Sequence, residues 1–196
     1  MLALFTTLSG IFSCKNDKCG PFPNRYKLVS MNGKSYQVTD TTTGNVQLAE
    51  IDSDTLNFDQ YAIYLKFGIA TYYAGTGFNW FSAAYACSPV EPTTDETIDG
   101  IRITSDKDFD PAHPAGSDLS DLFDVIPAYY HLSIYPSDRY DLQQFIATQP
   151  KAPDELTLLL KARPDHPDIF SFQVAYHQDG VEHHSFEYTT SPVGLR

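Results

Sequence analysis

Acidic residues alternate in the run DKDFD at residues 106–110, which is the spacing of carboxylate ligands in a calcium-binding loop. An EF-hand requires glycine at the sixth position and glutamate at the twelfth, but this chain has Pro111 and Ser117 there. The pattern therefore excludes an EF-hand. We expect a solvated acidic loop, and the alternative is an irregular calcium site that also uses Asp118 or Asp121.

Two histidines near the end of the chain, His177 and His183, are the candidate ligands for a transition metal. A hairpin over residues 169–189 would make them diagonal neighbours roughly 7 Å apart on its outer face, close enough for two imidazoles to share an ion. Glu187 lies further along that face, and no third ligand is near in sequence. We therefore expect solvated histidines, no metal site and no cofactor.

Nucleophilic catalysis has little support in the sequence. No Gly-x-Ser-x-Gly elbow is present, and Cys87, which precedes Ser88 and Pro89, is the single candidate thiol nucleophile. A disulfide is the simpler interpretation of that cysteine. We expect a protein that is not an enzyme, with no catalytic residue assigned, and the alternative is an extracytoplasmic hydrolase whose catalytic residues are dispersed in the sequence.

Aromatic residues are concentrated in the segment TYYAGTGFNWFSAAYACSP, residues 71–89. Exposed rings could stack on sugars or anchor a protein partner, because they offer a large rigid surface at a small entropic cost. The alternative is that they fill a core. The candidate binding residues are Tyr72, Tyr73, Phe78, Trp80 and Phe81.

The first twelve residues, MLALFTTLSGIF, carry no charge. As a helix they would rise only about 18 Å, which is too short for a hydrocarbon core of roughly 30 Å, so the segment resembles the apolar region of a secretory signal. The tetrad Ile11-Phe12-Ser13-Cys14 resembles a bacterial lipobox, with Phe12 bulkier than usual. We expect lipid attachment at Cys14. The alternative is an ordinary cleaved signal or a buried strand with an incidental cysteine.

The whole composition limits the partners. Thirteen basic residues against 25 acidic residues give a formal charge of −12, so the electrostatic field of the protein repels a phosphate backbone and nucleic acid is not an expected partner. The content of 13 Tyr and 13 Phe favours β-strands, whose half-buried surface accommodates these rings. A chain of 196 residues with 42% hydrophobic residues can form one substantial core.

Period-two alternation of apolar residues predicts several strands separated by Pro and Gly. This pattern predicts a mainly β chain that forms an antiparallel β-sandwich, immunoglobulin-like in general architecture. We expect a leader at 1–13, a tether at 14–24 and one sandwich domain at 25–196. The alternating sets are Tyr61/Ile63/Leu65/Phe67/Ile69, Ile101/Ile103, Tyr130/Leu132/Ile134, Leu156/Leu158/Leu160 and Phe170/Phe172/Val174/Tyr176.

One or two short helices interrupt the predicted strands. Apolar residues recur at helical spacing after Ser117 and up to Pro127, and again over residues 138–148, before Pro150.

The last predicted hairpin needs a turn that keeps its aromatic residues on one face. A two-residue Asp179-Gly180 turn would place Phe186 on the wrong face, whereas a three-residue loop with Gly180 left-handed pairs His177 with Val181 and Phe172 with Phe186. We therefore predict the three-residue loop.

The segment from Ala86 to Phe123, together with the Cys14 leader, resembles small lipoproteins of the Bacteroidetes type that contain a domain of unknown function. The resemblance depends on Cys87-Ser88-Pro89, the strand IRITSDKDF and the turn AGSDLSDLF. It covers about a fifth of the chain and includes no catalytic signature. The resemblance implies an address in the bacterial envelope and no particular activity.

These observations predict a lipid-anchored protein of the bacterial cell envelope, in the outer membrane, that acts as a binding or assembly module for a glycan or a protein. If Cys14 carries lipid, Cys19 and Cys87 remain as an even pair in an oxidising compartment, and we expect them to form a disulfide. The alternative is a buried free Cys87 and a free Cys19.

Overall fold

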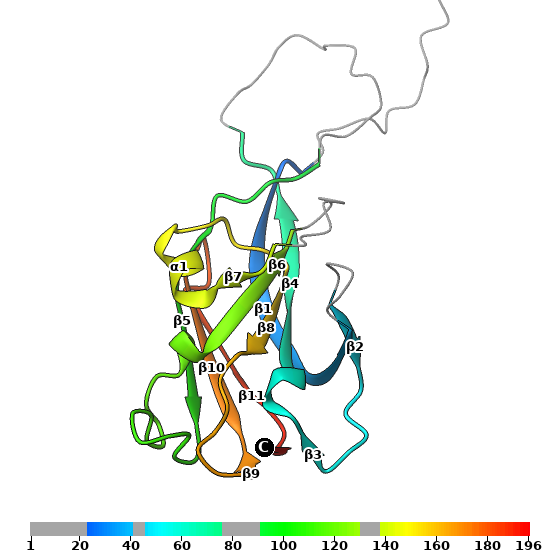
Figure 1. Ribbon diagram of the computed structural model, residues 1–196. Helices are drawn as coiled ribbons and strands as arrows, with labels where there is room; N and C mark the ends of the chain where they lie inside the picture. The colour runs from blue at the N-terminus through cyan, green and yellow to red at the C-terminus, as the bar shows by residue number, and fades with distance from the viewer. Residues whose placement is uncertain (1–22, 41–45, 76–90, 130–137) are drawn as a thin grey trace, which may run out of the picture.

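The computed structural model describes residues 23–40, 46–75, 91–129 and 138–196 (Figure 1). Over these ranges 54% of the residues lie in strands and 8% in helices, and nearly all strand pairs are antiparallel. The predicted fold class, a mainly β sandwich with few short helices, is therefore confirmed. Among the described residues, no helix has the length and apolarity needed to cross a membrane.

The larger sheet forms one layer of the sandwich. Its strand order is β2-β1-β4-β8-β6-β7, so β1 and β4 form its longest pair. The strands are β1 (Arg25–Asp40), β2 (Gln47–Ala49), β4 (Tyr61–Tyr72), β6 (Phe123–Ala128), β7 (Tyr140–Asp141) and β8 (Glu155–Leu160).

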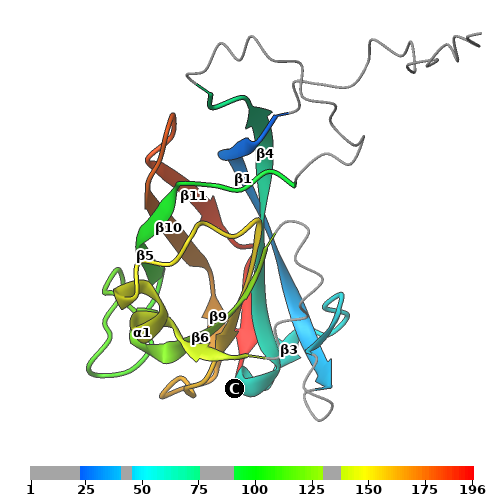
Figure 2. The ribbon, with the colours of Figure 1, turned by 90° about the horizontal axis from the view of Figure 1, so that it is seen from above.

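A three-stranded sheet with the order β11-β10-β5 forms the opposite layer, as Figure 2 shows from above. A second three-stranded sheet, β3-β12-β9, lies at the end of the sandwich where the chain terminates (Figure 1). The strands of these two sheets are β3 (Thr55–Leu56), β5 (Thr97–Ser105), β9 (Asp168–Phe170), β10 (Phe172–Asp179), β11 (Ser185–Thr189) and β12 (Val193–Leu195).

The core lies between the layers and is built by the alternation seen in the sequence. On β4, Tyr61, Ile63 and Leu65 are fully buried. Aromatic rings bridge the two layers: the ring centroids of Tyr61 and Phe172 are 5.4 Å apart, and those of Phe67 and Tyr176 are 4.7 Å apart. Four of the five predicted alternating sets thus lie on described strands, while Tyr130/Leu132/Ile134 lies outside the described residues.

The sequence pattern does not predict β1, the longest strand. Its sixteen residues, RYKLVSMNGKSYQVTD, are largely polar, and only Tyr26, Leu28 and Val38 are buried. The strand is held by its pairing with β4, from Arg25 opposite Tyr72 to Gln37 opposite Tyr61. Strand formation here depends on a partner distant in sequence rather than on an apolar face of its own.

One predicted helix is confirmed and the other is wrong. Asp141 accepts a hydrogen bond from the Gln144 amide and caps α1 (Leu142–Ala147), within the segment predicted to be helical. The segment after Ser117 has only a 3₁₀ turn, η2 (Ser120–Leu122), before strand β6 begins. Phe123, Val125 and Pro127 alternate with period two and are buried, and pairing of β6 with β8 selects the extended form. A second 3₁₀ turn, η1 (Phe58–Gln60), precedes β4.

The predicted register of the last hairpin is also wrong. His177 lies opposite Ser185, and Tyr176 lies opposite Phe186, so β11 is displaced by four residues from its predicted position. An even shift leaves Phe186 on the core side, as the aromatic pattern required. Gly180 does not have the predicted left-handed conformation, which among the described glycines occurs at Gly116 with φ of 77°.

Candidate functional site

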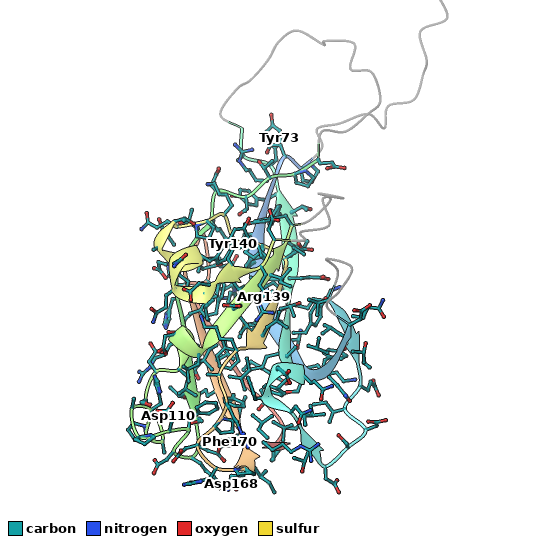
Figure 3. The ribbon with its side chains drawn as sticks, viewed as in Figure 1. Tyr73, Asp110, Arg139, Tyr140, Asp168 and Phe170 are labelled. Atoms are coloured by element: carbon teal, nitrogen blue, oxygen red, sulfur yellow. The ribbon has the colours of Figure 1, made fainter. Side chains whose placement is uncertain are left out.

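Of the five predicted binding aromatics, Tyr72 and Tyr73 lie in the described part of the chain, whereas Phe78, Trp80 and Phe81 lie outside it. Tyr72 ends β4 and is half-buried. The next residue, Tyr73, is 55% exposed and lies at the far end of the sandwich from Asp168 and Phe170 (Figure 3). This end therefore presents at least one large aromatic ring to solvent.

Asn24 joins three parts of the chain at this end. Its side-chain amide donates to the carbonyl oxygen of Ala74 at 3.3 Å and accepts from the Ala74 amide at 2.9 Å. Its backbone amide donates to Tyr72, and its carbonyl oxygen accepts from Thr93. Asn24 is the last residue of the predicted tether, while Ala74 and Thr93 flank the segment 76–90 in sequence. The last tether residue therefore contacts described residues on both sides of the segment 76–90.

A buried carboxylate stabilises the same end from inside. Glu96 is 1% exposed, and its Oε2 accepts a hydrogen bond from the Leu28 amide at 2.7 Å. Its Oε1 accepts from the Val181 amide, in the connection between β10 and β11, at 2.9 Å. Glu96 thereby links the two layers, because Leu28 belongs to the larger sheet and Val181 adjoins the smaller one.

Tyr26, the buried tyrosine next to this carboxylate, keeps its phenol protonated at neutral pH. Burial, reinforced by Asp154, Tyr129 and Glu96, raises the pKa of Tyr26 to about 12. Its hydroxyl donates to the carbonyl oxygen of Ala152 at 3.3 Å. Tyr26 and Glu96 therefore stabilise the interior of this end of the sandwich.

The acidic segment predicted as a solvated loop is ordered by its own carboxylates. Asp110 accepts the backbone amides of Ala112 and His113 at 2.8 and 2.9 Å, and Asp108 accepts the amide of Ala115 at 2.8 Å. Asp118 accepts the Ser120 amide at 3.0 Å. Within the described ranges no group of three or more His, Cys, Asp or Glu side chains is placed to hold a metal ion.

A cavity of about 620 Å³ lies beside this segment. Its charged lining combines Asp108 and Asp110 with residues from the connection into β9, among them Asp165 and the 86% exposed His166. Lys107 and Asp168, which also line it, form an ion pair with each other. Asp108 and Asp110 contribute to the lining of the cavity while one oxygen of each accepts backbone amides.

The two histidines predicted as outer-face neighbours do not have that arrangement. His177 lies on β10, but His183 lies in the connection before β11, since the register differs from the predicted one. The His183 ring is 5.7 Å from that of Phe186. Glu187 instead accepts a hydrogen bond from the Gln173 amide group at 3.4 Å.

Sequence reasoning missed both Asn24 and Glu96. Asn24 lies in PFPNRY and Glu96 in PTTDETI, where each resembles an ordinary polar residue of a connection. The partners of their side chains are 50 to 85 residues away in sequence, so no local spacing could reveal them.

The remaining predicted site residues, Cys14, Cys19 and Cys87, lie outside the described residues. Asn24 and Thr93, which follow Cys19 and Cys87 in sequence, are joined by a backbone hydrogen bond. In comparisons with protein-family models, curated proteins and solved structures, the chain has no match.

Proposed function

We propose that this chain is a lipid-anchored protein of the bacterial cell envelope and that its sandwich is a binding or assembly module for a glycan or a protein. In this proposal Cys14 carries the lipid that holds the protein to the outer membrane. The binding surface includes Tyr72 and Tyr73, together with Phe78, Trp80 and Phe81. The protein belongs with the small Bacteroidetes-type lipoproteins that its sequence resembles.

The observation that carries the proposal is the meeting of the tether and the aromatic segment at Asn24. Cys14 precedes Asn24 by ten positions, and a fully extended chain of that length reaches roughly 35 Å. A lipid on Cys14 would therefore hold the aromatic end of the sandwich near the bilayer. The opposite end, with β9 and β12, would be the more distant one.

The same junction supports a disulfide between Cys19 and Cys87. Cys19 precedes Asn24 by five residues and Cys87 precedes Thr93 by six, while Thr93 and Asn24 are joined by a backbone hydrogen bond of 3.2 Å. Two short segments that start from bonded residues have ample length for their cysteines to meet. Such a bond would disfavour the unfolded chain by roughly 4 kcal/mol in the chain-entropy account.

Two measurements on the full chain, expressed in a bacterial host with its leader, test the anchor and the binding surface separately. For the anchor, labelled fatty acid should be incorporated into the wild type and not into Cys14→Ala. Label retained in Cys14→Ala would contradict the anchor.

For the binding surface, a photo-reactive amino acid at Tyr73 should cross-link a partner, and Tyr73→Ala should weaken its binding. The matched control is the same probe at Ile169, which is 57% exposed at the opposite end. Equal cross-linking from both positions would contradict the assignment of the binding surface.

The alternative function is an extracytoplasmic hydrolase, and the observation that favours it is the cavity lined by Asp165, His166 and Asp168. If the cavity were catalytic, hydrolysis of a glycan or peptide library by the wild type would be lost in His166→Gln and retained in Tyr73→Ala. Activity that survives His166→Gln would reject this site.

A further inference from the structure

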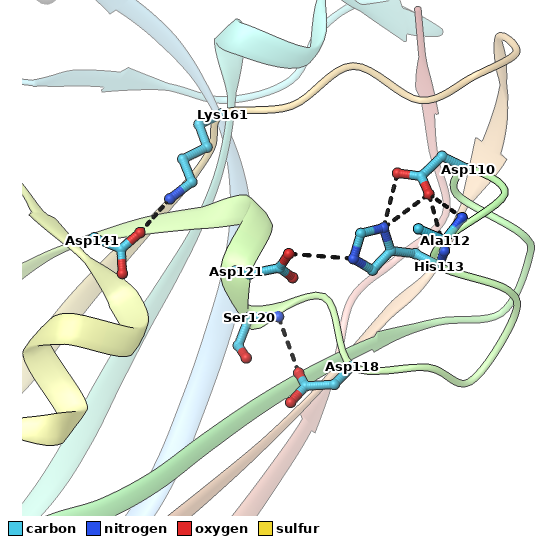
Figure 4. A network of polar contacts seen from close by, with 8 residues as sticks. All are labelled: Asp110, Ala112, His113, Asp118, Ser120, Asp121, Asp141 and Lys161. Atoms are coloured by element: carbon cyan, nitrogen blue, oxygen red, sulfur yellow. Dashed lines mark hydrogen bonds and ion pairs between the residues drawn. The ribbon is translucent and has the colours of Figure 1, made fainter.

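His113 lies between two carboxylates, one at each of its ring nitrogens (Figure 4). Its Nδ1 is 2.9 Å from both oxygens of Asp110, and its Nε2 is 3.3 Å from Oδ2 of Asp121. An ionised carboxylate only accepts hydrogen bonds, and a neutral imidazole carries one N–H. Only the doubly protonated imidazolium can therefore donate to both partners at once.

The surroundings of the ring favour this charged form. Its side chain is 17% exposed, and within the described residues Asp110 and Asp121 are the acidic groups at ion-pair distance from it. The hydrogen bond that the ring donates to Asp110, together with the charges of Asp110 and Asp121, raises the pKa of His113 above its ordinary value despite the opposing effect of desolvation.

The two carboxylates belong to different parts of the fold. Asp110 lies in the segment 106–119, which follows β5 and also lines the cavity. This segment covers the outer edge of β5, because the Leu119 amide donates to Ile103 at 2.7 Å and the Gly116 amide donates to Ser105 at 2.9 Å. Asp121 lies in η2, which leads into β6 of the opposite layer.

We propose that His113 is a proton-operated clasp that fastens the 106–119 segment to η2. In the protonated state the ring donates one hydrogen bond to each carboxylate, and the three side chains carry a combined charge of −1. When the proton leaves to solvent the combined charge becomes −2, and a nitrogen lone pair must face one carboxylate. The longer contact, to the more exposed Asp121, opens first. The segment that covers β5 and borders the cavity is then held at fewer points.

The wild-type protein tests the clasp directly by NMR. The imidazole carbon shifts of His113 should titrate with a midpoint above the ordinary histidine value of about 6.5. Hydrogen exchange of the Gly116 and Leu119 amides, each expressed as a protection factor, should lose protection several-fold as His113 loses its proton. The internal control is the Ile98 amide, which donates to Pro150 at the other end of β5 and should keep its protection.

A matched pair of variants separates the clasp from a general effect of charge. Asp121→Asn removes a charge that contacts the ring, so it should lower the midpoint of His113 and suppress the pH-dependent loss of protection. Asp118→Asn removes a neighbouring charge that binds the Ser120 amide and not the ring, so it should leave both unchanged. A wild-type midpoint at or below 6.5, unchanged protection at Gly116 and Leu119, or equal effects of the two variants would each overturn the clasp.

Discussion

The buried side chain of Glu96 connects two parts of the fold that are distant in sequence. Each carboxylate oxygen accepts a different backbone amide, one from β1 and one from the β10–β11 connection. The carboxylate therefore joins the larger sheet to the connection that adjoins the smaller one. Buried amides need such partners because an unpaired one loses the hydrogen bonds it had to water.

We predict that Glu96→Ala lowers the free energy of unfolding by about 3 kcal/mol, because two buried amides lose their acceptor at about 1–3 kcal/mol each. Glu96→Gln should cost roughly half as much, since one acceptor oxygen remains. Urea denaturation at pH 7 measures both. The control is Asp95→Ala: Asp95 forms an exposed ion pair with Arg25, and its loss should cost less than about 1 kcal/mol. Equal costs for Glu96→Ala and Asp95→Ala would contradict this role.

His113 and Asp110 should make stability depend on pH in two directions. The raised pKa of His113 contributes stability that is full below the ordinary histidine pKa of about 6.5 and is lost as pH rises through the folded value. Burial opposes ionisation of Asp110, but hydrogen bonds from His113 and Ala112 outweigh it and lower its pKa. Its contribution is full above about pH 4 and is lost as pH falls through the folded value.

We therefore predict that His113→Gln costs the most stability between about pH 4 and pH 6.5. Thermal or urea unfolding of wild type and variant across pH 3–9 gives the difference at each pH. A difference that is constant with pH would refute the prediction.

At this scale the sequence predicted a loop for residues 106–110 but not its internal hydrogen bonds. The alternating carboxylates suggested either solvent exposure or calcium, whereas the structure uses them as caps for nearby backbone amides. Asx-type hydrogen bonds of this kind are common for Asp in turns. What no spacing could show is that His113 lies between Asp110 and Asp121, because that depends on how the chain returns after Gly116.

At the scale of elements, the register of the β10–β11 hairpin could not be predicted from turn preferences and side-chain alternation alone. The aromatic pattern correctly required Phe186 to face the core, but it is satisfied by any even shift of register. The structure selects a longer connection in which Gln178 Nε2 donates to the carbonyl oxygen of His183 at 2.8 Å and Val181 binds Glu96. The second contact is long-range, so turn preferences alone favoured the shorter loop.

Gly180→Ala is still expected to destabilise the hairpin, but for a steric reason. A Cβ atom at Gly180 would lie 2.1 Å from the carbonyl oxygen of His183, so the backbone of the connection must move. We predict a loss of at least about 1 kcal/mol, in the range of overpacked sites. Gly116→Ala is the comparison: its Cβ meets open space, and its cost of about 1 kcal/mol should come from the positive φ alone. Crystal structures of both variants should show displacement at His183 and none around Gly116.

The end of α1 offers a stabilising change. Gln149 has φ of 48°, in the left-handed region, directly after the C-cap residue Thr148. Glycine is the usual residue at this position because a Cβ atom disfavours that conformation by roughly 1–2 kcal/mol. We predict that Gln149→Gly raises the free energy of unfolding by about 0.5 kcal/mol or more, after the greater freedom of glycine in the unfolded chain is subtracted. A lower midpoint in urea would contradict this.

At the scale of the whole molecule, the sequence predicted a sandwich of two layers but not the order of the strands within each sheet. Period-two alternation marks strands with one buried face, and so it identified β4, β5, β8 and β10. It could not show that β8 lies between β4 and β6, because strand order depends on pairings between distant segments. The polar strand β1 was missed for the same reason.

The C-terminal strand tests how the small sheet contributes to the whole. β12 lies between β3 and β9, and its Leu195 is fully buried. We predict that Leu195→Ala lowers the free energy of unfolding by about 2–5 kcal/mol, the usual cost of a cavity in a core. Ile169→Ala on the neighbouring β9 is the control, because that side chain is 57% exposed and should cost little. If calorimetry or urea denaturation gave the two variants similar losses in the free energy of unfolding, this end would not be part of the core.

The outermost strands of the larger sheet, β2 and β7, have three and two residues respectively. Long free edges are templates on which further chains can polymerise, and short outer strands offer few donors and acceptors for that growth. The outer edge of β5 is occupied by the 106–119 segment. A further chain therefore finds few free backbone groups at β2, β7 and β5, and the formal charge of −12 adds repulsion between copies of the molecule.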